Sequence, residues 1–284
     1  MKKLLTLLGL TLSLSFTACT SKSVAAETDM QAEPKGQNIS AYLTGAFVDT
    51  ATATANLEKE GFTVLATYKS TKKNETIVFT CKGLQMAADK PTRGFAAVMR
   101  MLIDNEHQAI SITNPIYFGK AFLQDDYNHK IASKVYAKIN KAFMGLKPNA
   151  DVYAYDDLDG YHFMMGMPYY EDAAVIGEGS NEELVAKAHK YKDGKNLIFE
   201  LKISDKATLI GYALGKKTSK FPKKIGTDKA QLLPYTVLIE DGEAKMLAPK
   251  FYLAVSYPLL SMGEFMTIAT VPGAIEKDLK KPFK

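Results

Sequence analysis

The sequence of 284 residues contains no tryptophan, two cysteines and four histidines. So few cysteines argue against a scaffold built on disulfide bonds and against a zinc site made from cysteine pairs. The histidines occur in none of the common metal-binding spacings. The net charge of +5 is too small to indicate a nucleic-acid-binding surface. Beyond the N-terminus, no apolar stretch reaches the roughly 18 residues that a membrane-spanning helix needs.

The composition is that of a folded protein. Hydrophobic residues make up 46% of the chain, with 15 tyrosines and 14 phenylalanines, and charged residues make up 24%. Such a chain can bury a substantial core, which a disordered chain cannot do. Its length is sufficient for one large domain or for two domains of ordinary size.

The first residues have the pattern of a secretory signal. Lys2 and Lys3 precede a short, largely apolar segment at residues 4–16, and small residues precede Cys19. A basic start, a short apolar region and a small-residue cleavage site are typical of exported proteins, and this apolar segment is too short to span a bilayer. We therefore expect the protein to be exported.

The position of Cys19 makes this expectation more specific. The tetrad Phe-Thr-Ala-Cys at residues 16–19 resembles the lipobox of bacterial lipoproteins. The resemblance implies that residues 1–18 are removed and that Cys19 carries the lipid that anchors the protein to a membrane. Several acyl chains on one cysteine are sufficient for stable anchoring. Because Thr20, and not aspartate, follows the cysteine, we expect an outer-membrane lipoprotein that faces the periplasm.

The chain divides into four parts on this basis. Residues 1–18 are the signal peptide, and residues 19–38, which are small, polar and aperiodic, are expected to form a flexible tether. Residues 39–150 and 151–284 are expected to form two lobes, joined by a hairpin near residues 151–167.

Local patterns predict both helices and strands throughout the chain. Ser180 and Glu183 form a capping box at the start of one helix, and Cys81 ends a β-branched run in which we expect a buried thiol. The expected helices cover residues 51–60, 94–104, 129–143 and 180–189. The expected strands cover residues 62–68, 76–81 and 196–203, and the expected hairpins join 152–155 to 162–165 and 235–239 to 244–247. This mixture predicts an α+β fold.

Two pairs of similar segments indicate that the lobes are related. Residues 74–79 resemble residues 196–199, and residues 110–115 resemble residues 253–258. We therefore expect a tandem duplication that gives two α/β sandwich lobes, each a small sheet packed by helices. The alternative is that these strands match only by composition.

The second half also resembles a known family. Leu-Pro, an alternating apolar strand and an Asp-Gly turn occupy residues 233–242, and Ser-Tyr-Pro follows at residues 256–258. This arrangement is similar to the core motif of the domain of unknown function 302 family. The resemblance implies a small α/β sandwich, with one clear C-terminal copy and one degenerate N-terminal copy. The biochemical role of that family is unsettled, so the resemblance implies no function.

One segment has the composition of a soft-metal site. Its members are side chains with a thioether or an imidazole, which are ligands suited to copper(I); they are His162, Met164, Met165 and Met167. If the segment is a strand, two of these side chains point to each face, so a bulge is needed for them to converge. The alternative is that the methionines fill a core.

A second segment, residues 215–229, is rich in lysine. It could contact anionic lipid headgroups or a phosphorylated ligand through its positive charges, which are those of Lys216, Lys217, Lys220, Lys223 and Lys224. The alternative is a solvated loop without a partner.

No motif in the sequence indicates catalysis. Nucleophile–base signatures, phosphate-binding loops and paired carboxylates in a recognisable spacing are all missing from it. We therefore expect a non-enzymatic binding or envelope-associated module, with a second copy or an envelope protein as its partner and an unidentified small molecule as its ligand. A periplasmic copper(I)-binding protein is one alternative. An enzyme with a site assembled between the lobes is another, and a pocket lined by titratable groups would favour it.

Overall fold

The computed structural model describes residues 31–284. The predicted signal peptide and the lipidation site at Cys19 lie outside the described residues. Within the described residues, no helix is both long and apolar enough to cross a membrane. The last part of the predicted tether packs on the fold, because the Tyr155 hydroxyl donates a hydrogen bond of 2.7 Å to Glu33.

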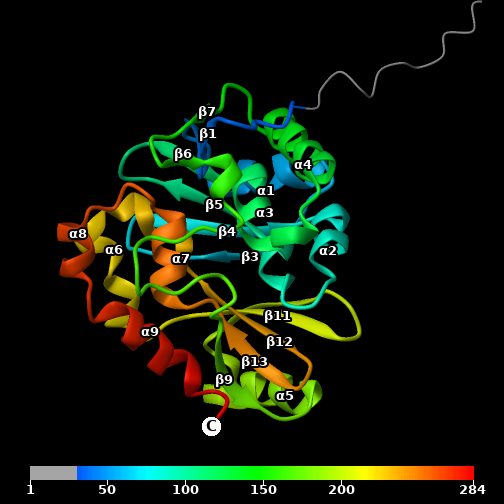
Figure 1. Cartoon of the computed structure of the whole chain (residues 1–284), viewed down its shortest axis with the longest axis vertical. Coiled ribbons are helices and arrows are strands. Elements are labelled where there is room, and N and C mark those ends of the chain that lie inside the picture. Colours follow the sequence, from blue (N-terminus) through cyan, green and yellow to red (C-terminus); the bar gives the residue numbers. More distant parts are fainter. Residues whose placement is uncertain (1–30) are drawn as a thin grey trace, which may run out of the picture.

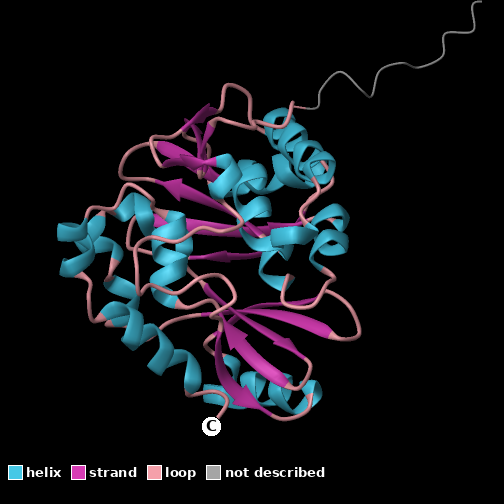
Figure 2. Ribbon diagram, in the orientation of Figure 1, coloured by secondary structure: helices cyan, strands magenta, loops and turns pink. Residues whose placement is uncertain are grey.

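Two antiparallel sheets form the framework of the described chain (Figures 1 and 2). The first has the strand order β3-β4-β5-β6-β2-β7 and the second has the order β10-β11-β12-β13-β9. The strands of the first sheet are β2 (Tyr42–Ala46), β3 (Thr63–Tyr68), β4 (Asn74–Thr80), β5 (Met99–Asp104), β6 (Ala109–Thr113) and β7 (Lys147–Pro148). Those of the second are β9 (Ala174–Glu178), β10 (Leu197–Lys202), β11 (Ala207–Tyr212), β12 (Tyr235–Glu240) and β13 (Glu243–Met246).

Helices cover the outer faces of both sheets, and a large apolar core lies between the sheets. Helices α1, α2 and α4 pack on one face of the first sheet, α5 packs on the second sheet, and α3 and α7 contribute to the core between the lobes. The α-helices are α1 (Thr50–Lys59), α2 (Lys82–Ala88), α3 (Pro115–Leu123), α4 (His129–Ala142), α5 (Asn181–Lys190), α6 (Pro222–Ile225), α7 (Pro249–Ser256), α8 (Met262–Thr267) and α9 (Val271–Lys280). The 3₁₀ helices are η1 (Gly94–Ala97), η2 (Gln124–Asp126), η3 (Tyr155–Asp157), η4 (Tyr191–Gly194), η5 (Thr218–Lys220) and η6 (Thr227–Leu232).

The two lobes have the same topology. The first runs β2-α1-β3-β4-β5-β6-α3 and the second runs β9-α5-β10-β11-β12-β13-α7. In both sheets the first strand of the series pairs with the last one, and the other strands follow in sequence order. The predicted α+β fold with two related lobes is therefore confirmed.

The segments from which we inferred the duplication are nevertheless not equivalent. Residues 74–79 lie in β4, whose counterpart is β11, whereas residues 196–199 begin β10. Residues 110–115 include the end of β6, whose counterpart is β13, whereas residues 253–258 lie mainly in α7. Both pairs matched because buried strands and helices share apolar residues, whatever their place in the topology.

Two predicted elements are wrong. The expected helix at residues 94–104 is a short η1 followed by β5, all six residues of which are buried. A strand buried on both faces shows no alternation, so its sequence resembles that of a buried helix.

The expected hairpin between residues 152–155 and 162–165 does not form. Instead, β8 (Val152–Ala154) pairs with β1 (Asn38–Ser40), and residues 162–165 contain no strand. The second sheet begins only at Ala174, so an irregular segment and η3 connect the lobes. The chain turns into η3 (Tyr155–Asp157) directly after β8, so no second strand returns beside it.

The helix ends follow local chemistry. The Asp49 carboxylate accepts hydrogen bonds from the N–H groups of Ala51 and Thr52 at the start of α1, and Gly61 follows its end with a φ of +77°. The predicted capping box of Ser180 and Glu183 is present at the start of α5. Such caps satisfy the N–H groups that a helix leaves unpaired.

Each lobe extends a segment to the other one, shortly before its own fourth strand. From the second lobe, Gln231 of η6 donates hydrogen bonds of 3.0 Å to the carbonyls of Arg100 and Ser111. From the first lobe, the N–H of Thr92 donates a bond of 2.9 Å to Glu240 at the end of β12. This reciprocal exchange fixes the two lobes against each other and creates a pocket between them.

Candidate functional site

A pocket of about 470 Å³ lies where the first sheet meets η6 and the end of α7. This is the size of a site for a small organic molecule. Ten of its lining residues come from the first lobe and its linker to the second: Tyr42, Thr44, Leu102, Asp104, His107, Ala109, Ile110, Ser111, Asn149 and Asp151. The second lobe contributes Asp228, Lys229 and Tyr257. We call this space the interlobe pocket.

Asp104 and His107 form a pair at one side of the interlobe pocket. Asp104 ends β5 with a buried carboxylate, and one of its oxygens accepts the N–H groups of Glu106 and His107 at 2.9 and 3.0 Å. The other oxygen lies 2.7 Å from His107 Nδ1. This hydrogen bond with Asp104, reinforced by the negative charge, raises the pKa of His107.

Asp151 lines the same pocket from the segment that leads into β8. Burial is the main reason why its pKa is raised, and the negative charge of Asp228 adds to this effect. The positive charge of Lys229 and a hydrogen bond of 2.9 Å from Asn149 Nδ2 act in the opposite direction. The carboxylate of Asp151 is therefore only partly compensated by its neighbours.

The interlobe pocket carries a net negative charge. Three aspartates and one lysine line it, which gives a formal charge of −2 with a neutral His107 and of −1 with a protonated His107. Lys229 is already paired, since its Nζ lies 3.2 Å from the carboxylate of Asp228. The remaining negative charge of the pocket would therefore attract a cation.

Two tyrosines supply flat apolar surface to the pocket. The rings of Tyr42 and Tyr257 are stacked, with their centroids 5.9 Å apart and an angle of 25° between them. Burial raises the pKa of both hydroxyls, so both remain neutral, and that of Tyr257 donates a hydrogen bond of 2.6 Å to the carbonyl of Lys229. Aromatic carbon beside carboxylates suits the carbon chain of an organic cation.

None of these residues was predicted from the sequence as part of a site. They come from five segments that are distant in the sequence, and none of the segments contains a known motif. The one local signal is Asp104, three residues before His107 at the end of a strand, and it has no diagnostic spacing by itself.

The residues of the predicted copper site lie elsewhere, in the irregular segment between the lobes. His162 Nε2 is 2.9 Å from the carbonyl oxygen of Met167, and its ring is stacked on Tyr169 at 4.2 Å. Met164 and Met165 are 46% and 94% exposed, so they do not fill a core, whereas Met167 packs against it. In residues 31–284, no group of three or more His, Cys, Asp and Glu side chains could hold a metal. Copper binding through His162 and the three methionines stays a prediction.

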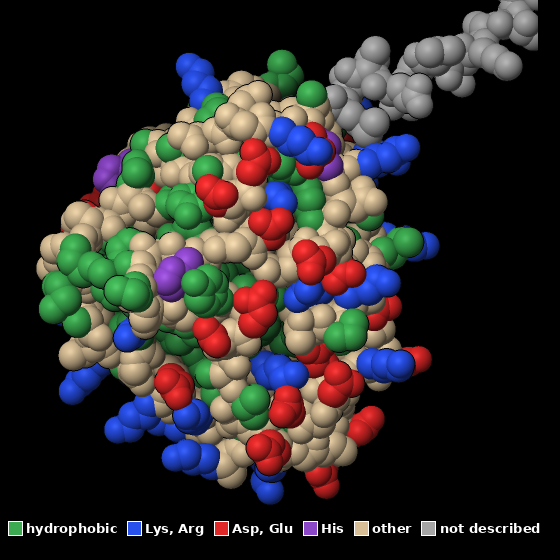
Figure 3. Space-filling view, in the orientation of Figure 1, with side chains coloured by type: hydrophobic (Ala, Val, Ile, Leu, Met, Phe, Trp, Pro, Cys, Tyr) green, Lys and Arg blue, Asp and Glu red, His purple; other side chains and the backbone are tan. Residues whose placement is uncertain are grey.

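The exposed methionines are part of an apolar surface around α8. The ring of Phe163 is stacked on Phe265 of α8 at 5.9 Å, which places this part of the interlobe segment beside the helix. Met262 and Met266 of α8 are also exposed. Figure 3 shows hydrophobic side chains gathered over α8.

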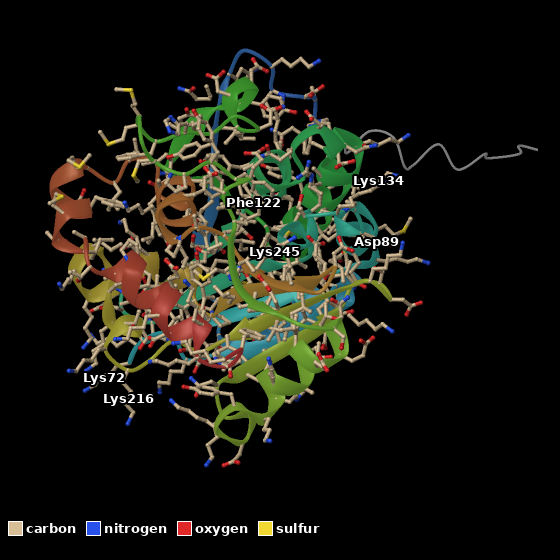
Figure 4. The ribbon with its side chains drawn as sticks, turned by 60° about the horizontal axis from the view of Figure 1, so that its bottom comes forward. Lys72, Asp89, Phe122, Lys134, Lys216 and Lys245 are labelled. Atoms are coloured by element: carbon tan, nitrogen blue, oxygen red, sulfur yellow. The ribbon has the colours of Figure 1, made fainter. Side chains whose placement is uncertain are left out.

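The predicted lysine-rich loop is helical. Phe221 and Ile225 are buried and hold η5 and α6 on the fold, while the five lysines remain exposed. Lys216 points away from the molecule in Figure 4. Lys224 donates a hydrogen bond of 3.0 Å to the carbonyl of Thr267 at the end of α8. An anionic partner for these lysines stays a prediction.

The chain matches no family model, no curated protein and no solved structure. Its similarity to the domain of unknown function 302 family therefore stays a prediction.

Proposed function

We propose that this protein is a lipid-anchored binding protein of the periplasm, and that the interlobe pocket takes a small organic amine. The ligand class is inferred from Asp151, which is a partly buried carboxylate with a raised pKa in a pocket of net negative charge. The export and the lipid anchor rest on residues 1–19.

An ammonium group would balance the negative charge of Asp151 in the pocket. A positive charge within about 4–6 Å of Asp151 favours its ionised form and offsets the loss of hydration that burial imposes. Hydrogen bonds between an ammonium group and a carboxylate are among the strongest that proteins make. The stacked rings of Tyr42 and Tyr257 would contact the carbon chain of the same ligand.

The ligand class can be tested with three molecules that have the same four-carbon chain. Putrescine carries two ammonium groups, 1,4-butanediol is neutral and succinate carries two carboxylates. We expect putrescine alone to raise the melting temperature and to bind in a calorimetric titration. Equal responses to putrescine and butanediol would contradict the proposal.

Asp151→Asn is the matching variant, because the amide oxygen of asparagine can still accept the hydrogen bond from Asn149. We expect it to weaken putrescine binding by tenfold or more, which corresponds to about 1.4 kcal/mol. Asp193→Asn is the control. Asp193 is an exposed residue of η4 with a φ of +54°, a conformation that asparagine tolerates. This control should bind putrescine like the wild type.

Catalysis at the same site is the second candidate. The hydrogen bond between His107 and Asp104 could orient an imidazole base, and Ser111 lines the pocket as well. Among the described hydrogen bonds, however, none joins the His107 ring to the Ser111 hydroxyl, and catalysis by a serine needs that contact. We therefore place binding first. Chemical conversion of a bound amine, followed by mass spectrometry, would reverse this order.

A further inference from the structure

A second site is indicated by Arg100, which lies in the interior between the lobes. Arg100 is part of β5 and is only 4% exposed. Its guanidinium group donates a hydrogen bond of 3.1 Å to the carbonyl of Pro234 in the second lobe, and it also hydrogen-bonds to the Tyr252 hydroxyl. None of the ion pairs found in residues 31–284 involves Arg100.

The guanidinium group is also incompletely hydrogen-bonded. Its Nε is buried and has no hydrogen-bond partner in the described structure. Its central carbon lies 5.9 Å from the centre of the Tyr252 ring, which gives a favourable cation–π contact but no counter-charge. A buried cation without an anionic partner is unfavourable, and arginines are almost never fully buried unless they are paired.

Beside Arg100 is a small cavity with a volume of about 40 Å³. A water molecule needs roughly 10–15 Å³ measured in this way, so the cavity can hold a few waters or one small anion. Phe122 also lines it and lies in the interior of the molecule in Figure 4. We call this space the Arg100 cavity.

The polar groups of the Arg100 cavity are suited to an anion. None of its lining residues is acidic, and the Nε–H of Arg100 is a donor without a partner. The Tyr252 hydroxyl, which accepts from Arg100, can still donate its own proton, whereas the Ser256 hydroxyl is hydrogen-bonded to Tyr42. Gln231 likewise already uses its amide N–H groups on two carbonyls. The donors come from both lobes, so an anion here would connect them.

We propose that the Arg100 cavity binds a small monovalent anion, of the size of chloride, bromide or formate, and that this anion stabilises the contact between the lobes. The unpartnered Nε and the adjacent cavity carry the proposal. It is independent of the amine in the interlobe pocket, although Tyr42 lines both spaces.

Bromide is the probe for this site, because its anomalous scattering identifies it in a crystal. The full protein is crystallised without halide and then soaked in sodium bromide. We expect an anomalous peak in the Arg100 cavity, at hydrogen-bond distance from the guanidinium. A cavity that contains only water would overturn the proposal.

A solution experiment measures the same binding through stability. At constant ionic strength, bromide or formate replaces a bulky anion such as gluconate, and the melting temperature is followed as the small anion is added. A ligand that binds the folded state raises stability with the logarithm of its concentration above its Kd. We expect this rise in the wild type, and a rise at least tenfold weaker in apparent affinity for Arg100→Met.

Arg93→Met is the control, because Arg93 is the other arginine, pairs with Asp126 at 3.1 Å and does not line the cavity. We expect it to keep the wild-type response to bromide. An equal response in Arg100→Met would overturn the proposal. If Arg100→Met does not fold, the bromide soak of the wild type decides the question alone.

Discussion

Asp104 and Glu240 occupy the same position in the two lobes. Each is the last residue of the fourth strand of its lobe, and both residues are buried, at 4% and 3% exposure. Asp104 accepts N–H groups of its own turn, whereas Glu240 accepts the N–H of Thr92 from the other lobe. The same strand end thus closes a turn in one lobe and connects the two lobes in the other.

This difference predicts how Glu240 affects stability with pH. Burial raises the pKa of Glu240, so the folded state holds this proton more tightly than the unfolded state does. Glu240 therefore contributes most to the unfolding free energy at a pH below its pKa in the unfolded chain. This contribution is lost as the pH rises through its pKa in the folded protein. Glu240→Gln keeps an acceptor for Thr92 and removes the charge. We expect this variant to equal or exceed the wild type in unfolding free energy at pH 8, with a smaller difference at pH 4, by urea denaturation.

Asp278 is a partly buried carboxylate, and its pKa is shifted in the opposite direction to that of Glu240. Burial opposes its ionisation, but hydrogen bonds from Lys281, Thr218 and Gly215 outweigh burial and lower the pKa of Asp278. Its contribution is present above the unfolded pKa and is lost as the pH falls through the folded pKa. Asp278→Asn should destabilise the protein by about 1–2 kcal/mol at pH 7 and by less at low pH. Parallel pH profiles for the two variants would contradict this assignment.

The packing between the lobes can be tested at Gly94. A methyl group at this position of η1 would lie 2.3 Å from Leu238 Cδ1 in β12, so the two lobes would have to move apart or Leu238 would have to change its rotamer. We expect Gly94→Ala to cost about 1–3 kcal/mol of unfolding free energy, as overpacked cores do.

Gly273→Ala is the control for this substitution. Gly273 lies in α9, and no heavy atom is within 4 Å of the added methyl group. Alanine in a helix is preferred over glycine, so we expect a gain of about 0.5–1 kcal/mol. Two variants with equal stability would mean that the Gly94 contact does not hold the lobes together.

The Asp104–His107 pair predicts a titration result. Because Asp104 raises the pKa of His107, Asp104→Asn should return the imidazole pKa toward its usual value. Nuclear magnetic resonance of the imidazole nitrogens across pH 5–9 measures this change, and His107→Gln assigns the signal. An unchanged titration curve in Asp104→Asn would show that the hydrogen bond is not formed in solution.

The predicted lipid anchor can be tested in cells. Cys19 is the residue that the lipobox-like tetrad marks for lipidation, so Cys19→Ala should move the protein from the membrane fraction to the soluble fraction. Cys81→Ala is the control, because Cys81 is a buried free thiol. Membrane association that survives in Cys19→Ala would refute lipid anchoring.

Elements with a local chemical signal were predictable from the sequence. The capping box of Ser180 and Glu183 and the Asp-Gly turn at residues 241–242 act on neighbouring residues, and both are present in the structure. The strand β5 was not predictable, because burial on both faces removes the alternation that distinguishes a strand. Sequence patterns predict an element from its own residues, whereas β5 is a strand because it pairs with β4 and β6.

The interlobe pocket depends on tertiary structure even more than β5 does. Asp151 and Lys229 are 78 positions apart in the sequence, and only the exchange of segments between the lobes brings them to one pocket. The titratable groups that make this site chemically distinct are ordinary surface residue types when they are considered one by one. Their function arises from burial and from the charges around them, which a single sequence does not contain.

The most direct test of the proposed function is a crystal structure of the protein with putrescine. We predict that the amine occupies the interlobe pocket, with one of its nitrogens about 2.7–3.0 Å from the carboxylate of Asp151 and its carbon chain against Tyr42 and Tyr257. An interlobe pocket without putrescine at saturating concentration, or putrescine bound with neither nitrogen near Asp151, would contradict the account.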